Sequence, residues 1–291
     1  MPRTIAEGFN DFLKKLTPTD TELEAAKSHR ASIESRLKND FDLQRFFRIG
    51  SFGNGTSISG YSDVDYLGSL VSNFYGTSST YSLGKVRDSL SARFPNTGVN
   101  VRCPAVVVPF GTKKSETTEI VPANFVDRKD EISTYRIADG VGGWMKASPE
   151  AHNAYVKKID DKLGGKVKPL IRFIKAWKYF QNVPISSFYL ELRVAKYAYE
   201  ESAIVYDIDI KKILKLLSDI GLASIQDPAG ISGYIMACKS EADRINALSK
   251  LQTALTRATN ARDATYREKI SEAFEWWRLL YNYEFPTYYY G

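Results

Sequence analysis

The residues most able to do chemistry lie in the stretch 49–67. Two aspartates, Asp63 and Asp65, are separated by one apolar residue, and eleven residues separate them from the pair Gly50-Ser51. On an extended strand, side chains two residues apart point to the same side, so both carboxylates would project together. Two close carboxylates repel each other and favour a divalent cation, and hard oxygen ligands of this kind suit Mg²⁺.

The pair Gly50-Ser51 adds a second function to this stretch. A Gly-Ser turn that opens a short helix offers backbone N–H groups to a phosphate. Metal-binding carboxylates beside a phosphate cradle describe a nucleotidyl-transfer site. Two simpler explanations are a surface Ser-Asp turn at Asp63 and an ordinary helix N-cap at Ser51. The spacing between the two motifs favours the catalytic interpretation.

The composition is that of a soluble globular protein. The chain has 291 residues, 43% hydrophobic and 25% charged, which is enough for one large domain or two ordinary ones. The net charge of +6 is typical of ordinary solubility, and a positive cleft for triphosphates or nucleic acid is the alternative. Two cysteines and two histidines stand in no ligand spacing, which excludes a zinc cluster or a disulfide framework. No apolar run approaches the roughly 18 residues of a membrane span, and the start is no signal peptide, so we expect a cytoplasmic protein without a membrane partner.

The pattern of apolar residues divides the chain into an α/β half and a helical half. Glycines and a proline between 140 and 149 mark the change of composition. We expect one helix over 19–39 whose apolar stripe is interrupted by Arg30, and another over 82–94. The other expected elements are strands at 45–49, 62–71, 99–109 and 117–121, a short helix at 51–57, a turn at 111–114, and helices at 150–163, 168–181, 186–199, 210–220, 241–259 and 263–281. This order fits a bilobed α+β enzyme with its cleft between the lobes.

The motif from Gly50-Ser51 to Asp65 resembles the signature of the polymerase-β-like nucleotidyltransferases, and its spelling resembles the CD-NTases. These are bacterial relatives of cyclic GMP–AMP synthase and the oligoadenylate synthases. The resemblance covers about residues 15–285 and includes 119–123, 144–149, 170–178 and 185–192. It implies a polymerase-β-like nucleotidyltransferase core, a mixed sheet with flanking helices, followed by an oligoadenylate-synthase-like helical domain. The expected domains are an N-terminal helical spine at 1–40, the core at 41–145, the C-terminal helical domain at 146–284 and a flexible tail at 285–291.

The resemblance also implies a set of metal ligands. Asp63 and Asp65 would bind two Mg²⁺ ions, with Mn²⁺ as a substitute, and Glu119 matches the third carboxylate. The family usually has Asp at this position, so Glu116 and Asp127 are the alternatives, and an exposed strand charge is a further explanation for Glu119.

Other positions match the family's nucleotide-binding residues. Gly50 and Ser51 would hold the donor phosphates. Lys175 would bind the triphosphate, although Lys168, Arg172 and Lys175 could equally form one solvated helix face. Ser187 would contact the nucleotide and Phe188 would stack on the base, unless Phe188 is a core residue. The predicted nucleotide-binding residues are Gly50, Ser51, Arg172, Lys175, Ser187 and Phe188.

The resemblance implies an enzyme that joins NTPs into a cyclic di- or trinucleotide second messenger with release of pyrophosphate. It further implies antiphage signalling with an effector that senses the product. The alternatives are a transferase that makes linear oligonucleotides, extends RNA ends or attaches AMP to proteins, or an inactive nucleotide or nucleic-acid sensor. Intact Asp63 and Asp65 argue against the sensor, and the lack of a zinc-ligand insertion argues against activation by DNA. Gly291 could be attached to a target by a ubiquitin-like ligase, or the tail could simply be frayed.

Overall fold

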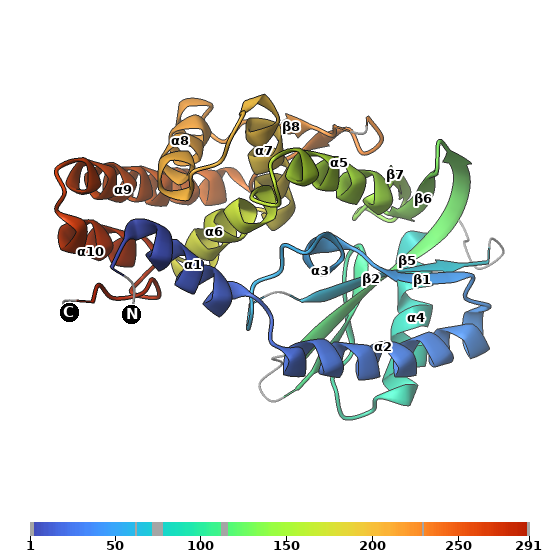
Figure 1. Ribbon diagram of the computed structural model, residues 1–291. Coiled ribbons are helices and arrows are strands. Elements are labelled where there is room, and N and C mark those ends of the chain that lie inside the picture. The colour runs from blue at the N-terminus through green and yellow to red at the C-terminus, as the bar shows by residue number, and fades with distance from the viewer. Residues whose placement is uncertain (1–2, 62, 72–77, 112–115, 229, 290–291) are drawn as a thin grey trace. The chain divides into compact units, whose positions relative to one another are not determined.

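The computed structural model describes residues 3–61, 63–71, 78–111, 116–228 and 230–289 (Figure 1). The chain forms two compact units. The first, here called the sheet unit, comprises 18–155 and 228–233; the second, the helical unit, comprises 1–17, 156–227 and 234–291. The first seventeen residues thus group with the C-terminal helices. The domain limits expected from the sequence differ from these units and stay a prediction.

The sheet unit is built on a mixed sheet. Among the described residues it has seven strands in the order β1-β2-β5-β4-β3, with β6 beside β5 and β7 beside β6. Strands β2 and β5 are parallel, and the other pairs are antiparallel. The strands are β1 (Arg45–Arg48), β2 (Val64–Leu70), β3 (Asn100–Arg102), β4 (Ala105–Phe110), β5 (Glu116–Lys129), β6 (Ile132–Ala138) and β7 (Trp144–Ala147).

Helices α2 (Asp20–Phe41) and α4 (Ser79–Arg93) cover one face of this sheet (Figure 1). Val64 and Tyr66 of β2 point to that face and are buried together with residues of both helices. Because side chains alternate along a strand, Asp65 points to the opposite face. The hydrophobic core and the predicted catalytic aspartate are therefore on opposite sides of the same strand.

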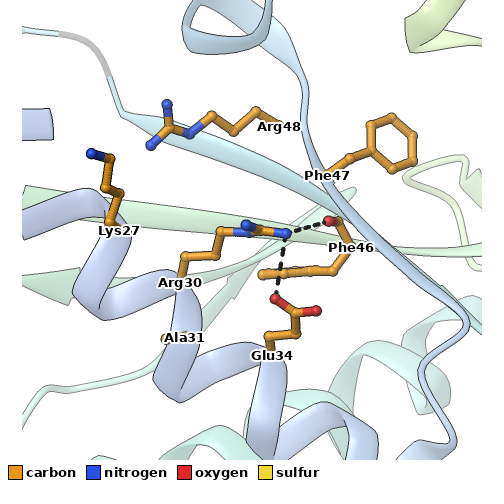
Figure 2. Close-up of a pocket in the computed structure, with 7 residues that line it drawn as sticks. All are labelled: Lys27, Arg30, Ala31, Glu34, Phe46, Phe47 and Arg48. Atoms are coloured by element: carbon orange, nitrogen blue, oxygen red, sulfur yellow. Dashed lines mark hydrogen bonds and ion pairs between the residues drawn. The ribbon is translucent and has the colours of Figure 1, made fainter. Parts of the chain in front are cut away.

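Helix α2 begins with the predicted capping box, and the contacts of Arg30 explain why this residue interrupts the apolar stripe of the helix. The Thr19 and Glu22 side chains each accept a hydrogen bond from the other residue's backbone N–H. Arg30 lies over the Phe46 ring, donates to the Phe46 carbonyl oxygen at 3.0 Å, and pairs with Glu34 at 3.4 Å (Figure 2). These side chains line a hollow of about 540 Å³ between α2 and β1. It lies on the helix-covered side, so it is not the site of Asp65.

The helical unit contains α1 (Ile5–Leu16), α6 (Val167–Phe180), α7 (Ser187–Glu200), α8 (Tyr206–Asp219), α9 (Glu241–Tyr266), α10 (Ile270–Leu280) and the short hairpin of β8 (Ile225–Gln226) and β9 (Tyr234–Ile235). Helix α5 (Pro149–Lys162) begins in the sheet unit and ends in this one. No helix of the described ranges is long and apolar enough to cross a membrane.

An aromatic cluster forms the core of the helical unit. Phe9 and Phe12 of α1 contact Phe173 of α6, and both also contact Phe285 near the chain end. Phe285 is 2% exposed, so the segment expected to be a flexible tail begins with a core residue. Gly291 lies outside the described residues.

Several elements differ from the sequence-based expectation. The run 99–109 is a hairpin rather than one strand, since Arg102 pairs with Ala105 and leaves Cys103 and Pro104 as the turn. Proline cannot donate to a strand ladder, which explains the break. Helix α9 continues to Tyr266 because a stripe of buried alanines continues through the predicted boundary. Helix α1, as an element separate from α2, and strands β6 to β9 were not expected.

One buried carboxylate supports the start of α6. Asp160 Oδ1 accepts hydrogen bonds from the backbone N–H groups of Val167 at 2.9 Å and Lys168 at 3.0 Å. The N-cap residue of α6, Lys166, makes no such side-chain bond. Asp160, at the end of α5, therefore caps the N-terminus of α6 although it belongs to a different helix.

We predict that Asp160→Ala lowers the free energy of unfolding by about 1–3 kcal/mol, because one buried and one partly buried N–H group lose their acceptor. The control is Asp161→Ala, whose side chain is 61% exposed in an ion pair with Lys157, and which should change it by less than about 0.5 kcal/mol. Denaturant unfolding followed by circular dichroism measures both. Equal losses in the two variants would contradict the capping role.

Candidate active site

Parallel pairing of β2 and β5 brings the predicted carboxylates together. Asp65 lies directly opposite Glu119 in the strand register, so their side chains share one face of the sheet. Asp63 precedes β2 by one residue and belongs to the same face by alternation. The three acids therefore converge on the side that α2 and α4 do not cover.

The register also distinguishes Glu119 from its alternatives. Glu116 is three residues earlier in β5, so it faces the other side, where its carboxylate lies 3.6 Å from His29. Asp127 lies beyond a register shift between Phe125 and Asp127 and pairs with Thr134 of β6. Of the three candidates, Glu119 is the one placed beside Asp65.

The Gly50-Ser51 loop approaches the same aspartate. Helix α3 (Gly50–Asn54) follows β1, and its N-cap residue Ile49 donates its backbone N–H to the Asp65 carbonyl oxygen at 2.9 Å. Ser51 is thus not the N-cap, and that simpler explanation of its presence is wrong. Gly50 has φ +58°, and a Cβ there would overlap the Asp65 carboxylate. Only glycine allows this loop to lie so close to Asp65.

The side of β2 and β5 that carries Asp63, Asp65 and Glu119 is here called the acidic face. Arg102 also lies on this face, and sequence reasoning missed it. Its Nη2 lies 2.9 Å from Asp63 Oδ2 and also contacts Glu119. Asn100 pairs with Val107, and Val107 pairs with Glu119, so these three side chains share one face of the sheet. Arg102 lies two residues after Asn100, and alternation places it on that face as well. With three carboxylates and one guanidinium, the formal charge of this cluster is −2. The signal that could have revealed Arg102 is its position just before the Cys103-Pro104 turn.

The residues present fit a divalent cation. Their oxygens are the hard ligands that Mg²⁺ prefers, and they remain partly accessible, with side-chain exposures of 40% for Asp63 and 16% for Glu119. A cationic nitrogen already bridges two of them. Within the described ranges, however, no three His, Cys, Asp or Glu side chains are arranged as a ready metal site.

The predicted cations of α6 have different surroundings and do not form one solvated face. Lys175 is fully buried, and its Nζ lies 2.7 Å from Glu191 Oε1 of α7. Lys168 Nζ lies 4.0 Å from Asp160 instead. Burial lowers the pKa of the Arg172 guanidinium, and the nearby charge of Asp160 opposes this shift. The solvated-face explanation therefore does not account for Lys175.

Ser187 and Phe188 lie in the first turn of α7. Ser187 Oγ accepts a hydrogen bond from Lys178 Nζ at 2.6 Å and is 3.1 Å from the Tyr179 hydroxyl, while Ser186 caps the helix. Phe188 is 37% exposed, so it is not a core phenylalanine. The structure brings together the acids within the sheet unit, and Ser187 and Lys178 within the helical unit. That the two groups share one nucleotide stays a prediction.

We expect Gly50→Ala to reduce the initial rate of pyrophosphate release from NTPs at least about a hundredfold, because the new methyl group displaces the Asp65 carboxylate. Gly84→Ala is the matched control, since a Cβ there meets nothing within 4 Å. Its rate should equal that of the unaltered protein. Normal activity of the Gly50 variant would show that the close approach to Asp65 is unimportant.

Comparison with known proteins agrees with this geometry. Residues 4–160, more than half of the chain, match the model of the Second Messenger Oligonucleotide or Dinucleotide Synthetase domain. A probable cyclic nucleotide synthase of Bacillus cereus (strain VD146) is 28% identical over 280 residues, covering 89% of this chain and 81% of that protein.

Solved structures show the same fold. CdnC of Escherichia coli MS115-1, solved with ATP, superposes with a TM-score of 0.75 at 18% identity, covering 96% of this chain and 98% of the other. The Vibrio cholerae DncV cyclic AMP-GMP synthase, solved with the linear intermediate pppA(3′,5′)pG, gives 0.74 at 16% identity, covering 94% and 93%. The chain therefore belongs to the Second Messenger Oligonucleotide or Dinucleotide Synthetase family, which confirms the predicted bacterial CD-NTase, its α+β nucleotidyltransferase fold and its function in cyclic oligonucleotide synthesis.

Proposed function

We propose that this protein uses Mg²⁺ to join two or three NTPs into a cyclic product at the acidic face of β2 and β5. The observation that carries the proposal is the register of Asp65 opposite Glu119, with Gly50 against the same carboxylate. This arrangement supplies metal-binding oxygens and phosphate-binding N–H groups side by side, as nucleotidyl transfer requires.

Each protein group has a defined task in this proposal. Asp63, Asp65 and Glu119 would hold the divalent ions. When bound, these ions neutralise triphosphate charge and lower the pKa of the attacking ribose hydroxyl. The Gly50 and Ser51 N–H groups and the Ser51 hydroxyl orient the donor phosphates, while Lys175 contacts the triphosphate and Phe188 stacks on the base. Arg172 and Ser187 complete the predicted nucleotide contacts.

The bond changes are the same in every cycle. The ribose oxygen forms a bond to the α-phosphorus of the donor and gives up its proton, and the bond from that phosphorus to pyrophosphate breaks. A linear intermediate results, and a further transfer within this intermediate closes the ring. Support comes from DncV, which was solved with such a linear intermediate.

The cellular setting follows from the family resemblance alone. We infer antiphage signalling in the bacterial cytoplasm, with an effector protein that senses the cyclic product. A ubiquitin-like ligase acting on Gly291 is a further prediction of that resemblance, and activation by DNA is not expected. The NTPs that yield product identify the bases, and nuclease mapping of that product identifies the linkage.

We expect the purified protein, incubated with each NTP and their mixtures in Mg²⁺ or Mn²⁺, to form a small product that resists phosphatase, because a ring has no terminal phosphate. Replacing Asp63 and Asp65 by Asn should reduce synthesis at least about a thousandfold through loss of metal ligands. Asp88→Asn on α4 is the matched control, since its side chain is 67% exposed beside Arg87. A product that loses terminal phosphate would indicate a linear oligonucleotide synthase instead.

A second experiment separates the structural and substrate-binding roles of Lys175. Because the Lys175–Glu191 pair is buried, Lys175→Met alone should cost about 3–5 kcal/mol of stability, and Lys175→Met with Glu191→Leu should recover most of it. If Lys175 binds the triphosphate, the stable double variant should still show a KM for NTP raised at least about tenfold. An unchanged KM would assign Lys175 to structure alone.

A further inference from the structure

We propose that Arg102 is a displaceable counter-ion of the acidic face: it holds Asp63 and Glu119 together when no metal is bound, and it competes with divalent ions for them. This inference rests on the proposed function of that face. It adds a residue that determines how tightly the site binds metal.

The geometry of the contact is the first argument. One guanidinium nitrogen of Arg102 contacts carboxylate oxygens of both Asp63 and Glu119. A single cationic nitrogen between two carboxylates supplies there the kind of positive charge that a metal ion would supply.

The second argument is that stability does not explain the contact between Arg102 and Asp63. The Arg102 side chain is 58% exposed and that of Asp63 is 40% exposed. Ion pairs at this exposure add little to the stability of a fold, since water screens them and long side chains lose freedom. A more specific reason for an arginine here is the repulsion among three acids on one face, which a positive charge relieves.

The third argument is that Arg102 can leave. It is the last residue of β3, a three-residue strand that ends the β1-β2-β5-β4-β3 row and whose residues are all exposed. Its side chain can therefore move into solvent without disturbing the core. A divalent ion, with twice the charge, is a stronger partner for the carboxylates, so binding of metal and release of Arg102 are linked.

The test measures binding of Mn²⁺ alone, without nucleotide, to the full chain by titration calorimetry or by the electron paramagnetic resonance signal of free Mn²⁺. Arg102→Gln should bind Mn²⁺ about tenfold more tightly than the unaltered protein, because a competing positive charge is gone. Arg102→Lys retains the positive charge and should therefore bind Mn²⁺ with nearly the affinity of the unaltered protein. Arg87→Gln on α4, which removes a charge next to Asp88, is the matched control and should have no effect.

Equal or weaker Mn²⁺ binding by Arg102→Gln, with circular dichroism showing a folded protein, would overturn the inference. Failure of this inference and failure of the proposed function give different results. If the Asp63→Asn and Asp65→Asn double variant loses Mn²⁺ binding while Arg102→Gln binds like the unaltered protein, Arg102 is not a competitor but the acids still hold metal. If the double variant binds Mn²⁺ as well as the unaltered protein does, the acids are not the metal site and both proposals fall.

Discussion

Mutual repulsion among three carboxylates is the constraint on which this active face depends, because the fold must hold like charges close together. The parallel pairing of β2 with β5 does so by placing Asp65 opposite Glu119. The opposite face of the same strands supplies the stabilising free energy, since Val64, Tyr66 and Ile120 are buried beneath α2 and α4. A slip of one residue would turn each acid into that core and expose the apolar side chains. The hydrophobic face thus fixes the register of the chemical face.

The Gly50-Ser51 loop, predicted to bind phosphate, depends on the same strand. The hydrogen bond from the Ile49 N–H to the Asp65 carbonyl oxygen ties the start of α3 to β2. Gly50 then brings its backbone against the Asp65 carboxylate at a positive φ. The N–H groups predicted to bind phosphate and the predicted metal ligands are consequently positioned by one shared backbone contact, which is why their spacing in sequence carries so much information.

What the sequence predicts well are features set by short-range geometry. The Thr19–Glu22 capping box and the placement of Asp65 on the face opposite the core follow from spacing along one element. Arg102 was missed because its place depends on a hairpin that was expected to be a single strand. The burial of Phe285 depends, in the same way, on α1 and α6, which are distant in sequence. Local periodicity contains no information on such pairings.

The two paired cations, Lys175 and Arg102, differ in how readily each can exchange its partner. Lys175 is fully buried against Glu191, and opening that pair would separate two buried opposite charges, which is costly. Arg102 is 58% exposed at the edge of the sheet, so water can replace its contacts as it leaves. An ion pair that an incoming metal ion is to displace is therefore better placed at such an exposed edge than in the core. A cation that is to act on substrate from a buried position must instead act with its partner still in place, so Lys175 can serve a triphosphate only as part of the Lys175–Glu191 pair.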